Sequence, residues 1–586
     1  MPHKTFRQLG FALLALAALT AGWLYWRTSQ AEVWGYDTLL FYLAAFAGPW
    51  LLRTYRKDGT VVEANKLSAL AGLLLGLGFP GLLPVPLTIF VGFVPLFLLY
   101  RNLQARKASY RTVFRHGFSG FLLFNIVATY WVTNTGFWAG LFAMLANAAL
   151  MALPWLALYW TGRKSPKIAF LAFAACWVAF EHFHYNWELN WPWLTLGNAP
   201  AQWPSVIQWY EVTGVLGGSA WVLGVNYVLF KTAFDPASPP EKKRSPLLIA
   251  AVVLLPMIGS LIRYATYAEP AGETISVAAI QPNFEPHFEK FADRKQAAPL
   301  DTIVRLSQAA LSEGPVDYLL FPETSFRQIR ENAPLESNVV RTLQTELAGR
   351  GAEYLVTGIS SFYVFADGEP VTRAVRYSGN TAYEGLNAAL QIRLGTEDYQ
   401  TYRKGVFVPG AESFPFRDVL PFMEPLVASI GGSVAGLGTQ EKRTPFTSPK
   451  AKVAPVICYE SVFGDYFRDY IREGAQAIFV VTNDGWWGNT AGHRQHLYYA
   501  SLRAIETRRA VVRSANVGAC AFIDQRGKIV SRTYYDQAGF LRGELQLNDA
   551  ITPYVRFGDM VSRIAMLLAA MVLLSNLARS LRREKA

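Results

Sequence analysis

The stretch from Ala454 to Ser461 reads APVICYES and decides the fold of the second half of the chain. A short β-branched run ends at Cys458 and is followed at once by Tyr459 and Glu460. Such a run is typical of a buried strand. A thiol at the strand end beside a carboxylate could be a structural side chain, half of a disulfide or a nucleophile.

The chain has three cysteines, an odd number at wide spacings. Cys176, Cys458 and Cys520 form neither a disulfide framework nor a C-x-x-C metal pattern. Cys176 lies in the apolar run LAFAACWVAF, where we expect it to act as a small hydrophobic side chain, and we expect Cys520 to be buried in a strand. His493 and His496 lack a cysteine or carboxylate that would complete a zinc set, so we expect them to make structural hydrogen bonds. We predict no metal and no cofactor.

The strand pattern around Cys458 recurs between residues 271 and 549. Short β-branched runs alternate there with helical stretches, and the runs are TISVAAIQP, VDYLLFPE, EYLVTGIS, LNAALQIRL, KVAPVICYE, AIFVVTND and ACAFIDQRG. This alternation argues for an α/β domain.

The rest of the chain is strongly apolar. Hydrophobic residues make up 52% of the sequence and charged residues 17%, against about 25% charged in a typical soluble domain. Ten runs are mostly near the ~20 residues that span a bilayer: 10–26, 38–53, 67–80, 85–100, 117–135, 137–161, 168–183, 206–230, 246–263 and 560–578. The net charge of +12 is concentrated in this part. We therefore expect no nucleic-acid partner.

Lysine and arginine alternate between the loops. They cluster before the first run and after every even-numbered run, so the positive-inside rule predicts cytoplasmic termini and an α/β domain outside the membrane. The sequence predicts an extra N-terminal transmembrane hairpin (1–60), a transmembrane helical domain (61–270), the α/β domain (271–549) and a C-terminal transmembrane helix with a cytoplasmic tail (550–586).

Three strand-end stretches carry complementary chemistry. LLFPETS contains Glu323, YRKGVFVPGAESFPF contains Lys404 and Glu412, and APVICYES contains Cys458. A thiol that attacks a carbonyl must lose its proton, which a carboxylate can accept. The resulting oxyanion needs a fixed positive donor. Taken singly, each residue also has an ordinary explanation as a solvated charge or a core cysteine.

In the order Glu, Lys, Cys, these residues resemble the nitrilase superfamily of carbon–nitrogen hydrolases. The resemblance implies an αββα sandwich in which Glu323 is the general base, Lys404 stabilises the oxyanion and Cys458 is the nucleophile. The backbone N–H of Tyr459 would complete the oxyanion hole.

Together with the apolar runs on both sides of the domain, the chain more closely resembles the apolipoprotein N-acyltransferase family. The stretches that carry the resemblance lie within roughly residues 67–580 and are FPE, RKGVFVPGAESFP (403–415), ICYE (457–460), TNDGWWGNTAGHRQHL (482–497), VRSANVGACAFID (512–524) and WPWLTLGN (191–198). The chain departs from the family pattern by an extra apolar hairpin before residue 60.

The resemblance implies a polytopic α-helical membrane domain plus an extracytoplasmic nitrilase-like α/β domain. It implies transfer of an acyl chain from a phospholipid, typically phosphatidylethanolamine, to Cys458 as a thioester. The α-amino group of the N-terminal diacylglyceryl-cysteine of an apolipoprotein would then take the acyl chain. The expected location is the inner membrane of a bacterium, with the catalytic domain in the periplasm, and we expect a monomer.

Six further residues are expected to support the site. Glu412 would position the lysine, Asn387 in EGLNAAL matches a family asparagine, and Tyr459 and Glu460 adjoin the nucleophile. Trp486 and Trp487 follow the stretch TNDG, and they would either belong to the core or line an acyl entrance.

Two other functions fit part of the pattern. A membrane-anchored amidase would use the same three residues with water as the acceptor, but it would not need ten spans. A transporter with a degenerate nitrilase-like sensor would place ionisable groups within its spans, and the predicted spans contain few. We therefore predict an acyltransferase.

Overall fold

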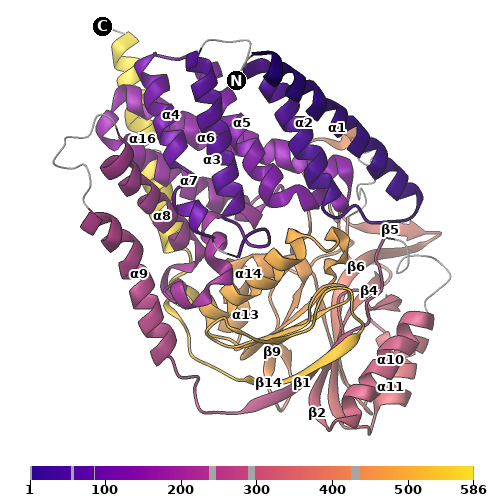
Figure 1. Cartoon of the computed structure of the whole chain (residues 1–586). Helices are drawn as coiled ribbons and strands as arrows, with labels where there is room; N and C mark the ends of the chain where they lie inside the picture. The colour runs from indigo at the N-terminus through magenta and orange to yellow at the C-terminus, as the bar shows by residue number, and fades with distance from the viewer. Residues whose placement is uncertain are drawn as a thin grey trace. The chain divides into compact units, whose positions relative to one another are not determined.

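The computed structural model describes residues 3–54, 59–84, 86–235, 246–287, 297–423 and 436–584. The chain divides into two compact units. The first comprises Met1–Ile262, Thr490–Gln495 and Asp559–Ala586, and the second comprises Arg263–Asn489 and His496–Gly558. Figure 1 labels the helices and strands of both.

The first unit is built from helices. They are α1 (His3–Ser29), α2 (Asp37–Thr54), α3 (Gly59–Leu77), α4 (Val94–Ala105), α5 (Tyr110–Thr129), α6 (Phe137–Lys164), α7 (Ala169–Tyr185), α8 (Tyr210–Leu229), α9 (Pro246–Thr266) and α16 (Met560–Glu584), with short 3-10 turns between several of them. Each apolar run of the sequence overlaps one of these helices.

Seven helices in the described ranges are long and apolar enough to cross a membrane. They are Lys4–Ser29, Pro86–Ala105, Phe137–Lys164, Pro166–Tyr185, Tyr210–Phe234, Leu247–Thr266 and Met560–Leu581. The runs on α2, α3 and α5 are helical as predicted but are not among these seven. The predicted fold class of this part, a polytopic α-helical membrane domain, is thus confirmed.

Helices α3 and α5 approach each other closely at small residues. A Cβ atom on Gly72 would lie 2.3 Å from the carbonyl oxygen of Gly120, so only glycine fits there. Nearby, Ser68 Oγ donates a hydrogen bond of 2.6 Å to the carbonyl oxygen of His116. Small residues and interhelical hydrogen bonds are the usual means of packing helices in a membrane, where the hydrophobic effect does not drive association.

The second unit contains two β-sheets. The larger runs in the order β14-β1-β2-β4-β6-β5, with β3 paired to β4 and β7 to β6, and the smaller in the order β13-β12-β11-β10-β9-β8. The strands of the larger sheet are β1 (Thr274–Gln281), β2 (Val316–Leu320), β3 (Phe326–Arg330), β4 (Ala352–Val364), β5 (Val375–Ser378), β6 (Thr381–Arg393), β7 (Tyr399–Arg403) and β14 (Gly539–Gln546). Those of the smaller sheet are β8 (Phe446–Thr447), β9 (Lys452–Ile457), β10 (Ala477–Thr482), β11 (Val511–Ala515), β12 (Ala521–Ile523) and β13 (Ile529–Arg532).

The two sheets face each other between helices. On the outer side of the larger sheet, α10 (Ala297–Ser312) and α11 (Asn338–Leu347) bury an apolar face against β1, β2 and β4 (Figure 1). Between the sheets, the ring of Tyr318 on β2 meets Phe479 on β10 edge to face, with ring centroids 5.2 Å apart. The smaller sheet is covered by α13 (Gly464–Arg472), where the Tyr470 hydroxyl donates to the carbonyl oxygen of Pro455. The predicted αββα sandwich is confirmed.

Strand direction determines where functional side chains gather. β1, β2 and β4 run parallel in one sheet, and β9, β10 and β11 run parallel in the other. Sites in sheets with parallel strands form beyond the carboxyl ends of those strands. Glu323 follows β2, and Cys458 follows β9 directly.

Candidate active site

Cys458 stands in a strained turn at the end of β9. Its φ angle is +48°, which non-glycine residues rarely adopt, and such a conformation costs about 1–3 kcal/mol and persists only where the surroundings hold it. The residue opens the 3-10 turn Cys458–Val462 and is only 7% exposed. Ser461 Oγ donates to the Cys458 carbonyl oxygen at 2.7 Å, which is one of the contacts that hold the turn.

Glu460 ties this turn to the segment that carries the lysine. Its Oε2 accepts a hydrogen bond of 2.8 Å from Ile457 N–H, and its Oε1 accepts one of 2.6 Å from Gly405 N–H. The Tyr466 hydroxyl also donates to Oε1. Burial raises the pKa of Glu460 above its ordinary value, although these donors act in the opposite direction. Glu460 is thus placed to fix the backbone on both sides of the site.

Glu323 lies in the loop that leaves β2 and is buried against strand β4. Gly358 on β4 permits this close approach, since a Cβ atom there would lie 2.5 Å from Glu323 Cα. Two backbone hydrogen bonds join the loop to the strand: Ser325 N–H donates to the Gly358 carbonyl at 2.8 Å, and Gly358 N–H donates to the Pro322 carbonyl at 3.2 Å.

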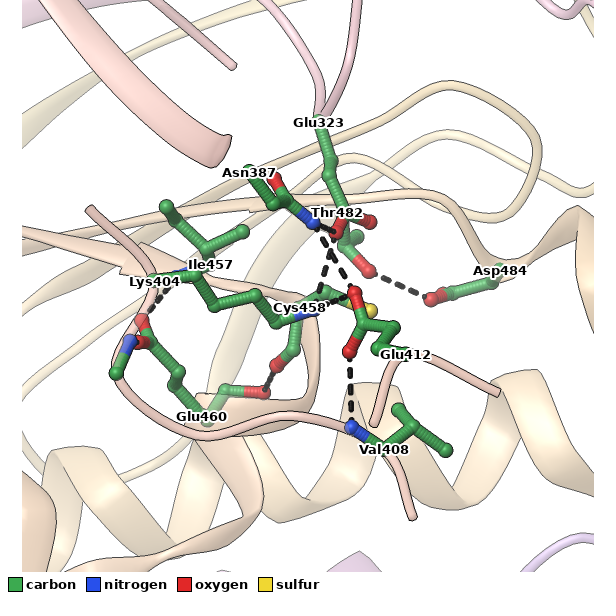
Figure 2. A network of polar contacts seen from close by, with 12 residues as sticks. Glu323, Asn387, Lys404, Val408, Glu412, Ile457, Cys458, Glu460, Thr482 and Asp484 are labelled. Carbon is green, nitrogen blue, oxygen red and sulfur yellow. Dashed lines mark hydrogen bonds and ion pairs between the residues drawn. The ribbon is translucent and has the colours of Figure 1, made fainter. Parts of the chain in front are cut away.

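Lys404 follows β7 and is fully buried between two carboxylates. Its Nζ donates to Glu412 Oε1 at 2.7 Å and to Glu323 Oε1 at 3.3 Å. Asn387 on β6 joins the same two carboxylates, because its Nδ2 lies 2.9 Å from Glu323 Oε1 and 3.2 Å from Glu412 Oε1. Figure 2 shows the polar ends of these four side chains converging beside Cys458.

The turn around Glu412 is held by its own side chain. Its Oε2 accepts a hydrogen bond of 2.8 Å from Val408 N–H, and its backbone N–H donates to the Val408 carbonyl. Both carboxylate oxygens of Glu412 therefore have fixed donors, Lys404 and Asn387 on one and Val408 on the other. A carboxylate engaged in this way is suited to hold the lysine in place.

The electrostatics favour a charged lysine and a neutral thiol. Burial alone would lower the pKa of Lys404, but the charges of Glu412 and Glu323 outweigh it and hold that pKa well above its ordinary value. Burial and the charge of Glu323 raise the pKa of the Cys458 thiol, against Lys404 and a hydrogen bond with Thr482. Cys458 is therefore a thiol at rest, and a thiol needs a base to become a reactive nucleophile.

The remaining predicted residues lie around this centre. Tyr459 is buried, with its ring edge to face with Phe463. Trp487 is also buried, whereas Trp486 is half-buried with its ring 5.1 Å from the ring of His287. Whether either tryptophan lines an acyl entrance stays a prediction.

Thr482 and Asp484 are contacts that the sequence patterns did not single out. Thr482 ends β10 and hydrogen-bonds the Cys458 thiol, and its Oγ1 donates to Asp484 Oδ1 at 3.0 Å (Figure 2). The stretch TNDG follows a buried strand, which is the only signal that could have found them. No group of three or more His, Cys, Asp or Glu side chains in the described residues is arranged to hold a metal ion.

The other two cysteines lie on other elements, Cys176 on α7 of the first unit and Cys520 just before β12 in the second. Both are free, and Cys520 is fully buried, with its backbone N–H bonded to the Gln281 side chain. Burial raises the pKa of Cys520 to about 11.

Comparison with known proteins gives matches over both halves of the chain. A family model described as the apolipoprotein N-acyltransferase N-terminal domain matches residues 71–228, and one described as carbon-nitrogen hydrolase matches residues 276–552. The solved structure of Saccharomyces cerevisiae Nit3, a member of branch 10 of the nitrilase superfamily, covers 47% of this chain and 91% of its own, at 17% identity and a TM-score of 0.34.

Similar full-length sequences extend across both halves. The apolipoprotein N-acyltransferase of Chlorobaculum tepidum is 29% identical over 524 residues, which cover 87% of this chain and 95% of that protein. The apolipoprotein N-acyltransferase of Azotobacter vinelandii is 31% identical over 425 residues, which cover 71% of this chain and 75% of that protein. With membrane-type helices and an αββα domain in one chain, and with matches of this extent, the chain belongs to the apolipoprotein N-acyltransferase family.

Proposed function

We propose that this chain is an N-acyltransferase that carries an acyl chain on Cys458. The acyl chain comes from a phospholipid and is transferred to the α-amino group of the N-terminal diacylglyceryl-cysteine of an apolipoprotein. The convergence of Glu323 and Lys404 beside Cys458 is the observation that carries the proposal. The seven apolar helices of the same chain support a donor that resides in a bilayer.

In the first half-reaction, Sγ of Cys458 attacks the ester carbonyl carbon of the phospholipid. Glu323 takes the thiol proton as the S–C bond forms, which the raised pKa of the thiol makes necessary. The ammonium of Lys404 stabilises the oxyanion, and the backbone N–H of Tyr459 is a second donor in this proposal. The ester C–O bond then breaks, and Glu323 returns the proton to the leaving alcohol oxygen of the lysophospholipid.

In the second half-reaction, the α-amine of the apolipoprotein attacks the thioester carbonyl carbon. The nitrogen loses a proton to Glu323 as the C–N bond forms, and Lys404 again stabilises the oxyanion. The C–S bond breaks, and the sulfur of Cys458 recovers its proton from Glu323. The products are an amide and the resting enzyme, so the mechanism is of the ping-pong type.

The supporting residues have roles that follow from their contacts. Glu412 keeps Lys404 charged and in place, and Asn387 aligns the Glu323 carboxylate. Glu460 holds the turn of Cys458 against the lysine segment. We assign Trp486 and Trp487 to the surroundings of the acyl chain.

The membrane arrangement in this proposal follows the distribution of basic residues. Both termini lie in the cytoplasm and the catalytic domain lies in the periplasm, at the inner membrane of a bacterium. The parts are a hairpin (1–60), a helical domain (61–270), the catalytic domain (271–549) and a C-terminal helix with its tail (550–586). We propose phosphatidylethanolamine as the donor and a monomer as the functional unit.

The test is mass spectrometry of the purified full chain after incubation with phosphatidylethanolamine vesicles. We expect an acyl mass on the peptide that contains Cys458, and discharge of that mass when a peptide with an N-terminal diacylglyceryl-cysteine is added. A Cys520→Ala variant should behave as the wild type, and Cys458→Ala should form no adduct. Absence of any adduct in the wild type would contradict the proposal, and discharge to water at the same rate without the peptide would favour an amidase.

A further inference from the structure

Three buried side chains form a polar network next to the nucleophile turn. They are Asp484 in the turn after β10, His496 on α14 (Ala491–Thr507) and Arg513 on β11, and each is at most 1% exposed. The His496 Nδ1 lies 2.9 Å from Asp484 Oδ1, and Arg513 Nη2 donates to Asp484 Oδ2. Arg513 Nη2 also lies 3.1 Å from His496 Nδ1.

The backbone leaves room for the Asp484 carboxylate. Gly518 has a φ angle of +136°, and a Cβ atom there would lie 2.9 Å from Asp484 Oδ2. On the other side, the ring of Trp487 meets the ring of His496 edge to face, with centroids 5.3 Å apart. The imidazole is therefore fixed by packing as well as by hydrogen bonds.

The far side of the imidazole meets the turn of Cys458. His496 Nε2 lies 2.7 Å from Ser461 Oγ and 3.2 Å from the carbonyl oxygen of Cys458. Ser461 Oγ is itself 2.7 Å from that carbonyl oxygen. The network thus contacts the backbone of Cys458 through His496 and Ser461, and it contacts the thiol through Asp484 and Thr482.

The tautomer of His496 follows from its partners. Arg513 Nη2 already donates to the Asp484 carboxylate, which is the stronger acceptor beside Nδ1, so we assign the ring proton to Nδ1. Nε2 of the neutral ring then accepts from the Ser461 hydroxyl. Burial and the charge of Arg513 lower the pKa of His496, against Asp484. The single hydroxyl proton of Ser461 then has two acceptors within reach, Nε2 of His496 and the carbonyl oxygen of Cys458. Ser461 therefore links the imidazole ring to the strained turn.

We propose that His496 is a positioning residue for Cys458, anchored by Asp484 and Arg513 and acting through Ser461. This inference rests on the proposed role of Cys458 as the nucleophile. A φ angle of +48° persists only while neighbouring groups hold it. Release of the Cys458 carbonyl allows the turn to relax toward negative φ, which moves the sulfur away from Glu323 and Lys404.

Two substitutions of His496 separate the two sides of the ring. The amide nitrogen of asparagine can replace Nδ1 and donate to Asp484, whereas the amide oxygen of glutamine can replace Nε2 and accept from the Ser461 hydroxyl. Both remove the ring that packs on Trp487, so both should lower the melting temperature. We expect His496→Gln to retain more of the Cys458 reaction rate than His496→Asn, which should lose about tenfold.

Ser461→Ala is the second variant, because the loss of a hydroxyl is less disruptive than the loss of a buried ring. Its matched control is Ser307→Ala, since Ser307 is also fully buried and donates to a backbone carbonyl, that of Ile303, at 2.7 Å. Ser461→Ala should slow the reaction of Cys458 by about tenfold, and Ser307→Ala should leave the rate unchanged.

Two rates are measured in the full-length protein: alkylation of Cys458 by iodoacetamide, and acyl-adduct formation with phosphatidylethanolamine vesicles. Wild-type rates in Ser461→Ala and in both His496 variants would overturn the inference. So would equal losses of rate in His496→Asn and His496→Gln that simply follow the fall in melting temperature. Alkylation needs no lipid, so a wild type without an acyl adduct would refute the proposed function while the alkylation rates still test the positioning role.

Discussion

The substitution Gly358→Ala tests whether the backbone of Glu323 must stay where the structure places it. The added Cβ would lie 2.5 Å from Glu323 Cα, 2.8 Å from the Pro322 carbonyl oxygen and 2.9 Å from Thr324 N. Carbon atoms in contact are normally about 3.5–4.0 Å apart. All three neighbours are backbone atoms, so rotation of a side chain cannot relieve the clash, and the loop must retreat from β4 by about 1 Å.

Such a retreat would break the weaker of two polar contacts that Glu323 Oε1 makes. Glu323 Oε1 lies 3.3 Å from Lys404 Nζ and 2.9 Å from Asn387 Nδ2. A further 1 Å places the lysine beyond hydrogen-bonding distance. A misplacement of about 1 Å can cost about 10²-fold in rate, and overpacking of this kind costs about 1–3 kcal/mol in stability.

The assay is the single-turnover rate of acyl-adduct formation on Cys458, measured beside the melting temperature. Gly385→Ala on β6 is the matched control, because the nearest atom to its added Cβ, Leu437 Cδ2, would lie at an ordinary 3.5 Å. We expect Gly358→Ala to be folded and about 10²-fold slower, with Gly385→Ala close to the wild type. A folded Gly358→Ala protein with the wild-type rate would refute the reasoning, because Glu323 would then not act from this position.

Three other predictions concern the reacting groups. Cys458→Ser should form almost no adduct, because a serine hydroxyl is much harder to deprotonate than a thiol. Cys520→Ala should keep the wild-type rate, and equal rates in the two variants would show that Cys458 does not carry the acyl chain. Lys404→Met should slow adduct formation by about 10²–10³-fold, since it removes a donor to the oxyanion, and a near-normal rate would contradict that role. Glu412→Gln should move the alkaline decline in the rate of adduct formation to lower pH. Glu412 helps to raise the pKa of Lys404, so the substitution lowers that pKa and the lysine loses its proton at a lower pH. The pH–rate profile of Glu384→Gln is the control, because Glu384 is a buried carboxylate whose cationic partner, Arg403, does not titrate in this range.

The main parts of the site could be predicted because each stands at a strand end that the sequence marks. The runs before Glu323 and Cys458 are β-branched, and parallel strands bring their carboxyl ends to one edge. Lys404 and Glu412 follow another strand and belong to one continuous motif. The structure brings these four side chains and Asn387 together. Their roles are those of the mechanism proposed above.

The contacts behind the nucleophile could not be predicted from spacing. The i, i+3 spacing of His493 and His496 indicates a helix face but says nothing of what packs across it. The partners of His496 lie on other elements, Asp484 after β10 and Arg513 on β11, and only the tertiary fold brings them together. The need for glycine at position 358 could not be predicted either. It arises because the loop that carries Glu323, distant in the sequence, packs closely against Gly358.

The mechanism proposed above gives a reason for the pairing of Lys404 with two carboxylates. In each proposed half-reaction Glu323 becomes neutral when it takes a proton, and at that moment the oxyanion develops its charge. A buried ammonium whose only carboxylate had been neutralised would tend to lose its own proton. Glu412 counters this loss, because it raises the pKa of Lys404 and its two oxygens accept from Lys404 Nζ at 2.7 Å and from Val408 N–H at 2.8 Å. In the proposed mechanism, Glu323 therefore moves protons while Glu412 holds the lysine in its charged form.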